Sequence, residues 1–242
     1  MCNQLKLMVL LTTLTMTCII LSPLNSTAAD EAKLIYKPLV KGAPNTRIGG
    51  GSRGSRGSRG IEGSAPVLSV LAPDHTGYTI YSQPTLYWSI SKVIDKPIKL
   101  TMAYTNFTLG MEPIIETEIK MPKNTGIQAI DLANINWKTK DKGLIPDMEY
   151  QWSVSIIMDK QQSSNDIVAS GTIKRVPQAL ADKVANQIAK ETDEKKQVVI
   201  YAENSMWYDA IDRLSKLISQ NPSDQELQSQ RVNLLQEVGL TN

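Results

Sequence analysis

The sequence contains only two cysteines, and both of them, Cys2 and Cys18, fall within the first 28 residues. Those residues have the character of a leader, so we expect the mature chain to contain no cysteine. Disulfide bonds, thiolate catalysis and cysteine metal sites are then excluded. The mature protein has to be held together by core packing alone, and a domain of about one hundred residues buries enough apolar surface for that.

Histidine is almost as scarce, because His75 is the only one. A histidine-rich metal site is therefore excluded, and a Ser-His-Asp triad would have to use this residue. The surrounding segment 73–77 is typical of a turn, and the nucleophile-elbow motif is absent from the sequence. We expect His75 to be an exposed turn residue, and we predict no catalytic, cofactor-binding or metal-binding residue.

Long apolar runs are also lacking, apart from Leu7–Leu21. Lys6 precedes this run, Pro23 interrupts it, and small residues follow at 26–29, which is the order of a signal peptide. We predict that residues 1–28 are a cleaved signal peptide and that the protein is exported to the periplasm, the cell surface or the medium. Two alternatives are a retained membrane anchor, for which the run is shorter than the roughly twenty residues a spanning helix needs, and a lipoprotein lipidated at Cys18.

Charge is nearly balanced overall, with 26 basic and 24 acidic residues, but its distribution is uneven. Residues 29–64 combine basic side chains with three Gly-rich Ser-Arg-Gly repeats, which predicts a flexible basic linker. The composition favours a plain solvated spacer; the alternatives are attraction to an anionic envelope surface or binding to an envelope protein. Export argues against nucleic acid as the partner. The surface-binding side chains predicted here are Arg47, Arg53, Arg56 and Arg59.

Residues 65–176 predict β-structure. Short runs rich in β-formers recur between turn residues, and their apolar residues alternate, which places one face of each strand on a core. Such a series is typical of a two-sheet sandwich. The predicted strands are Val67–Leu71, Thr85–Ile90, Ile98–Thr105, Ile114–Lys120, Ile127–Leu132, Tyr150–Met158 and Asp166–Arg175.

The segment before the sixth of these strands has the pattern Leu-x-Pro-x-x-x-Tyr, from Leu144 to Tyr150. It resembles the tyrosine corner of fibronectin type III and related immunoglobulin-like domains. That resemblance implies that the Tyr150 hydroxyl bonds to the backbone and fixes the corner. We therefore expect a mainly β fold, an immunoglobulin- or fibronectin-III-like sandwich, with Trp88 and Trp152 in or near its core.

Residues 177–242 predict helices, with an amphipathic stripe in Ala179–Lys190 and further helical runs over 197–220 and 227–238. The stretch Tyr201–Pro222 resembles a single tetratricopeptide repeat, because Trp207, Ala210 and Pro222 stand at or near its characteristic positions. One such unit cannot stack as a solenoid. We expect a helical appendix packed on the sandwich; the alternative is a hairpin that docks onto a partner with true repeats.

Short motifs follow one another along the whole chain after the leader. They are Lys41–Pro44, Arg47–Gly54, Leu71–Pro73, Ser82–Trp88, Ser163–Asp166, Trp207–Ala210 and Leu234–Leu240. Their order resembles a bacterial exported family catalogued as domain of unknown function 928. The resemblance implies a compartment but no activity. Members usually carry one cysteine after the glycine-rich motif and another in the strand around Ser155; this sequence has neither, so any disulfide they form is absent.

Carboxylate pairs are the remaining catalytic option. Glu116 and Glu118 alternate along one strand and could serve a glycan-cleaving site, while Asp159 and Asp166 flank a turn that could bind calcium. We expect solvated charge and turn capping instead, and we expect the tryptophans (Trp88, Trp137, Trp152, Trp207) to pack in the core rather than form a sugar platform. The leading hypothesis is a non-catalytic exported binding or structural module of the cell envelope. The alternative is an envelope glycan-binding or glycan-cleaving protein.

Overall fold

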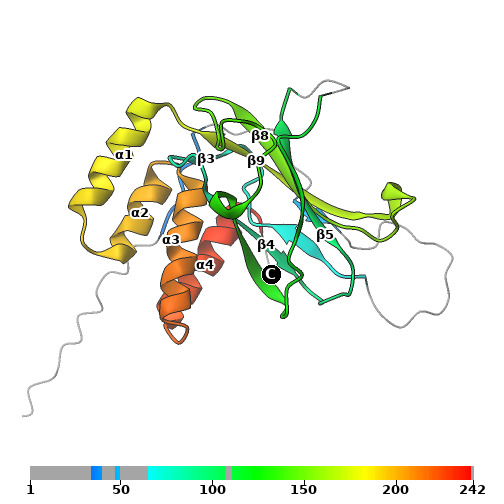
Figure 1. The fold of residues 1–242 in the computed structure, drawn as a ribbon. Helices are drawn as coiled ribbons and strands as arrows, with labels where there is room; N and C mark the ends of the chain where they lie inside the picture. The colour runs from blue at the N-terminus through cyan, green and yellow to red at the C-terminus, as the bar shows by residue number, and fades with distance from the viewer. Residues whose placement is uncertain (1–33, 40–46, 50–64, 107–110, 241–242) are drawn as a thin grey trace, which may run out of the picture. The chain divides into compact units, whose positions relative to one another are not determined.

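The computed structural model describes residues 34–39, 47–49, 65–106 and 111–240. The predicted signal peptide and most of the predicted linker lie outside these residues. Within the described part, two β-sheets are followed by four α-helices, so the fold is mixed, with a large β portion (Figure 1). None of the helices in the described ranges is both long enough and apolar enough to cross a membrane.

One sheet has five strands in the order β3-β9-β8-β5-β6, and the other has four in the order β1-β2-β4-β7. All neighbouring pairs are antiparallel except β3 and β9. The strands are β1 Ile48–Gly49, β2 Leu68–Val70, β3 Gly77–Thr79, β4 Thr85–Ile90, β5 Ile98–Tyr104, β6 Ile115–Ile119, β7 Gly126–Asp131, β8 Glu149–Ile156 and β9 Ile167–Arg175.

All the strands predicted from the sequence are present, each within two residues of its expected ends. Their alternation is also confirmed: Leu86, Trp88 and Ile90 of β4 are buried, and the same holds for every second residue of β8 from Tyr150. The sequence missed β1 and β3, because strands of two and three residues are too short to show a period of two.

The helices are α1 Gln178–Lys190, α2 Glu194–Glu203, α3 Trp207–Gln220 and α4 Gln225–Glu237. The helical run expected over 197–220 is divided between α2 and α3, because Ser205 adopts a left-handed conformation (φ 69°). Asp224 caps α4 by accepting a hydrogen bond from the Leu227 N–H, and Gly239, at φ 72°, ends it.

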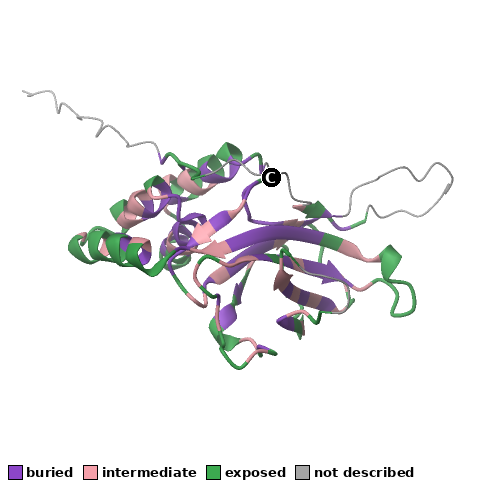
Figure 2. Cartoon of the chain, turned by 90° about the horizontal axis from the view of Figure 1, so that it is seen from above, coloured by how far each residue is buried: buried purple, intermediate pink, exposed green. Residues whose placement is uncertain are grey.

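The helices share the core of the sheets instead of forming an appendix beside it. Nearly every residue of the first two turns of α3 is buried, and the buried side chains of both sheets and of α1–α4 form one hydrophobic cluster (Figure 2). Two polar contacts tie α3 to the sheets: the Trp207 indole N–H donates to the Leu71 carbonyl at 2.9 Å, and the Tyr208 hydroxyl donates to the Thr172 carbonyl at 2.8 Å. The expected packing of residues 177–242 on the sheets is therefore present, and it extends to a shared hydrophobic core.

The N-terminal described segments also belong to this fold, which corrects the prediction that all of 29–64 is a flexible linker. Leu34 and Tyr36 are buried in the common cluster. The Tyr36 N–H donates to Glu237 and the Lys37 N–H donates to the Ala202 carbonyl, so this segment contacts α4 and the end of α2. The sequence could not show this, because Leu34 and Tyr36 stand in a short polar lead-in without a periodic pattern.

Candidate ligand-binding cleft

A cleft of about 360 Å³ lies where α2 and α3 meet the segment between β3 and β4. Its lining is mostly polar and combines hydroxyl, amide, carboxylate and basic side chains with the rings of three tyrosines. The lining residues are Tyr81, Gln83, Pro84, Thr85, Asp131, Tyr201, Tyr208, Asp209, Asp212, Arg213 and Lys216.

Asp209 lines the cleft from the first turn of α3 and is only 3% exposed. Its two carboxylate oxygens are both engaged: Oδ1 accepts from the Thr79 hydroxyl at 2.6 Å and Oδ2 accepts from the Ile80 N–H at 2.8 Å. Burial raises the pKa of this carboxyl to about 7, against the opposing effect of the two hydrogen bonds. Asp209 therefore joins the start of α3 to the end of β3, and it changes charge near neutral pH.

Tyr81 forms the exposed rim of the cleft, with 47% of its surface accessible. Its hydroxyl lies 2.9 Å from the hydroxyl of Tyr201, which is buried on α2. Burial, together with that hydrogen bond, raises the pKa of Tyr201 above its usual range, so Tyr201 stays neutral at physiological pH. The cleft thus has an aromatic ring facing solvent, held in place at its polar end.

The remaining charged residues of the cleft are paired within the protein. Asp212 accepts from the Tyr87 hydroxyl at 3.0 Å and from Lys216 at 2.7 Å. Arg213 forms an ion pair of 3.2 Å with Glu194 on α2. Across the cleft, Asp131 caps the turn after β7 by accepting from the Ala133 N–H and the Asn134 amide. Acids and bases nearly balance, so the cleft presents many hydrogen-bonding groups and little net charge.

The tryptophans predicted from the sequence lie elsewhere. Trp88, Trp137, Trp152 and Trp207 are all buried, so none offers a ring to a ligand. Glu118 borders a hollow of about 380 Å³ together with Trp88, but Trp88 is only 1% exposed. The carboxylate and the aromatic surface required by the glycan-cleaving alternative are therefore not brought together at β6.

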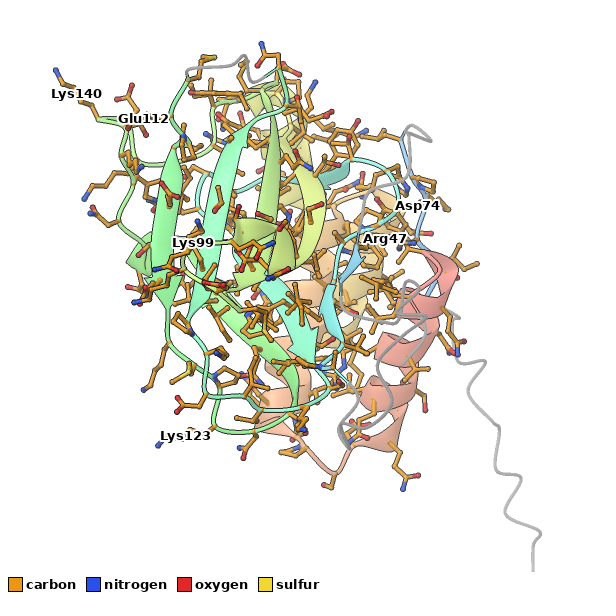
Figure 3. The ribbon with its side chains drawn as sticks, turned by 90° about the vertical axis from the view of Figure 1, so that its right-hand side faces the viewer. Arg47, Asp74, Lys99, Glu112, Lys123 and Lys140 are labelled. Atoms are coloured by element: carbon orange, nitrogen blue, oxygen red, sulfur yellow. The ribbon has the colours of Figure 1, made fainter. Side chains whose placement is uncertain are left out.

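Glu116, on the same face of β6, is paired with two lysines. Its carboxylate lies 3.3 Å from Lys99 on β5, labelled in Figure 3, and 3.1 Å from Lys138. The hydrogen bond from Lys138, followed by that from Lys99, lowers the pKa of Glu116. A carboxylate held ionised in this way is poorly suited to act as a general acid.

Asp159 and Asp166 act within their own turn. Asp159 accepts from the Gln161 N–H at 2.9 Å, and Asp166 accepts from the Met158 N–H at 3.0 Å. In the part of the chain that the structure describes, no three acidic, histidine or cysteine residues are grouped closely enough to hold a metal ion.

His75 is not the exposed turn residue that the sequence predicted, since only 5% of it is accessible. Its Nδ1 lies 2.8 Å from an Asp74 carboxylate oxygen, and its Nε2 lies 3.3 Å from the Tyr36 hydroxyl. The Tyr36 ring stacks on the imidazole, with centroids 5.8 Å apart, and meets the Trp207 ring edge-on. The turn is covered because the segment 34–39 folds back over it.

Arg47 is not a free surface cation either. Its guanidinium donates to the carbonyls of Ala72 and Val238, and it lies near Asp74 (Figure 3). The next two residues form β1, where Gly49 passes so close to β9 that a Cβ would lie 2.2 Å from the Val168 carbonyl oxygen. Arg47 therefore anchors β1 to the end of α4. The other arginines assigned to the tether, Arg53, Arg56 and Arg59, lie outside the described residues.

The structural residues predicted from the sequence occupy distinct places. The Ile145 N–H donates to the Tyr150 hydroxyl at 3.0 Å across the corner before β8. Trp152 donates through its indole N–H to the Tyr208 hydroxyl at 2.9 Å. Ala210 is buried in α3, whereas Pro222 is exposed in the turn before α4, so Pro222 is not a packed position.

The sequence did not reveal the cleft, because its two sides are about one hundred and twenty residues apart. Asp209 did carry a signal. It is the one acid in the otherwise apolar and aromatic stretch Trp207–Ile211. An acid among buried neighbours has to find a polar partner. Acids are common in the first turn of a helix, so Asp209 did not stand out from the sequence.

Comparison with known proteins gives a family but no activity. A sequence model described as "Domain of Unknown Function (DUF928)" matches residues 48–242. No curated protein matches the chain. A solved structure of Astrotactin-2, titled a conserved vertebrate-specific and perforin-like membrane protein involved in neuronal development, is similar at 12% identity and a TM-score of 0.23. The match covers 75% of this chain and 42% of that one.

Proposed function

The chain belongs to the family described as domain of unknown function 928, and we propose that it is an exported, non-catalytic binding module of the cell envelope. The leader-like residues 1–28 support export. The antiparallel strands and the Tyr150 hydrogen bond at the corner support an immunoglobulin- or fibronectin-III-like arrangement of the sheets. Folds of that type host many functions, so the argument for binding has to come from a site.

The cleft beneath Tyr81 is the observation that carries the proposal. It offers an exposed aromatic ring, an amide from Gln83 and a hydroxyl from Thr85, with acids and bases in near balance. Pockets that combine a ring face with converging polar groups fix the orientation of a ligand through hydrogen bonds. A weakly charged ligand rich in hydroxyl groups fits this chemistry, and the glycans of the envelope belong to that class.

Binding is favoured over cleavage by the state of the carboxylates in the cleft. Glycoside hydrolysis requires one carboxyl group that can donate a proton and a second that can act as base or nucleophile. Asp209, Asp212 and Asp131 each already accept two hydrogen bonds from the protein. Each carboxylate is therefore hydrogen-bonded within the protein, and none is left without such a partner to act on a substrate.

The proposal is tested by isothermal titration calorimetry, in which soluble glycan fragments released from the envelope are titrated into a protein of residues 30–242. Replacing Tyr81 by alanine removes the aromatic rim and should weaken binding about twofold to tenfold, given the roughly 0.5–1.5 kcal/mol that such ring contacts contribute. Met121→Ala, at another exposed apolar side chain, is the matched control and should bind as the unmodified chain does. Failure of the unmodified chain to bind any fragment, or full affinity in Tyr81→Ala, would contradict the proposal.

The basic repeat supplies a second, separable part of the proposal, namely attraction to an anionic envelope surface. Arg53, Arg56 and Arg59 should be replaced by glutamine together, while Arg47 is kept because it anchors β1. The triple variant should cosediment less than the unmodified chain with anionic lipid vesicles at low salt, and the difference should vanish as salt is raised. Equal cosedimentation at low salt would show that the repeat is only a spacer.

A further inference from the structure

A second hollow, of about 660 Å³, lies between α4 and the outer face of the four-stranded sheet. Its polar side chains are the hydroxyls of Ser69, Ser89, Ser91 and Thr125 and the guanidinium of Arg231. None of the described residues that line it is an acid. We call it the Arg231 groove. It differs from the Tyr81 cleft in that the one charged side chain among its described lining residues is basic.

Arg231 is half-buried on α4, where burial lowers the pKa of its guanidinium. Among the described residues, Arg47, Arg175 and Arg213 all donate to carbonyl oxygens or a carboxylate. Arg231 makes no hydrogen bond or ion pair with any described residue, although it lies near Tyr87, whose own hydroxyl is committed to Asp212. A partly desolvated guanidinium is stabilised when an acceptor binds to it.

The sheet side of the groove supplies further donors. Ser69 on β2 and Ser89 on β4 are directly opposite each other in the register, and Ile127 on β7 continues the same row. The Ser91 oxygen already accepts from the Val67 N–H at 2.8 Å, so its hydroxyl hydrogen is free to donate outward. The row therefore faces the groove with hydroxyl donors, flanked by the apolar side chains of Val67 and Ile127.

We propose that the Arg231 groove binds an organic anion, with one carboxylate or phosphate group on the guanidinium and a less polar body against Val67 and Ile127. A guanidinium recognises these two groups through paired N–H···O hydrogen bonds, and neighbouring hydroxyls add further donors to the same oxygens. The site is distinct from the Tyr81 cleft, so the inference goes beyond the proposed function and does not depend on it.

The test is to titrate isotopically labelled residues 30–242 with glucuronate, glycerol 1-phosphate and glucose, and to follow amide resonances. Glucuronate stands for a sugar carboxylate and glycerol 1-phosphate for a phosphate ester, while glucose is the uncharged control. At least one anion should shift resonances of Ser69, Ser89 and Arg231 saturably, and glucose should not. The anion that binds with the higher affinity shows whether the groove prefers a carboxylate or a phosphate ester.

Arg231→Gln should weaken anion binding about tenfold or more, because a hydrogen bond to a charged group contributes roughly 1.5–3 kcal/mol. Arg231→Lys keeps the charge but loses the planar pair of donors, so its affinity should lie between those of Arg231→Gln and the unmodified chain. Lys183→Gln, at an exposed cation on α1, is the control and should bind normally, as should Tyr81→Ala. The inference is overturned if neither anion shifts the groove resonances, or if a folded Arg231→Gln variant binds as well as the unmodified chain.

Discussion

Replacing Trp207 by alanine is expected to lower the free energy of unfolding by about 3–5 kcal/mol, the usual cost of emptying a buried aromatic site. The side chain is fully buried, its indole N–H donates to the Leu71 carbonyl, and its ring meets Tyr36. It therefore joins α3, the β2–β3 connection and the N-terminal segment at one point. Urea denaturation followed by circular dichroism measures the loss.

The same experiment tests whether helices and sheets share one core. In the unmodified chain, the helical signal and the near-ultraviolet signal of the tryptophans should disappear in one transition. Val232→Ala, at an exposed position on α4, is the control and should change stability by less than about 0.5 kcal/mol. A helical transition separate from that of the sheets, or a change below about 1 kcal/mol in Trp207→Ala, would show that the helices and the sheets do not share one core.

Asp209 is expected to make stability depend on pH in the direction opposite to that of most paired carboxylates. Its pKa in the folded protein is about 7, against an ordinary value of 3.8. Between these values the folded state holds a proton that the unfolded state has released, so stability falls as pH rises through this interval. The contribution is fully present below about pH 4 and lost above about pH 7, and it amounts to roughly 4 kcal/mol across the interval.

Replacing Asp209 by asparagine removes this titration and separates it from other effects. The stability of the unmodified chain relative to Asp209→Asn should decrease between pH 4 and 7.5, as measured by urea denaturation at several pH values. Glu118→Gln, at an exposed carboxylate, is the matched control and should follow the unmodified chain. Parallel pH profiles for the unmodified chain and Asp209→Asn would show that Asp209 is ionised in the folded state throughout.

The sheets could be predicted closely from the sequence because the apolar residues of several long strands alternate with polar ones. Alternation through Leu86, Trp88 and Ile90, or along β8, encodes both the strand and the face that it buries. The exceptions have local causes. β1 and β3 are too short to show a pattern of their own and are defined by their pairing with β2 and β9. The close backbone contact between Gly49 and β9 also leaves no periodic pattern in the sequence.

The sites depended on contacts between distant parts of the chain, which local patterns do not contain. Tyr81 and Tyr201 are 120 residues apart in sequence, yet their hydroxyls are hydrogen-bonded. His75 lies in the expected turn but is buried instead of exposed, because Tyr36 covers it. Tyr36 belongs to a short polar segment whose sequence shows no periodic pattern. Arg231 belongs to no motif of the sequence, and what distinguishes it is a groove whose described lining contains no acid.

The central claim, a non-catalytic binding module that uses the Tyr81 cleft, is tested most directly by mapping ligand contacts on the protein in solution. Labelled residues 30–242 should be mixed with envelope glycan fragments, and both the amide resonances and the fragments should be followed over many hours. The account predicts saturable shifts at Tyr81, Gln83, Thr85 and Arg213, with every fragment recovered intact. Shifts confined to other surfaces, or steady cleavage of the fragments that Asp209→Asn abolishes, would contradict it.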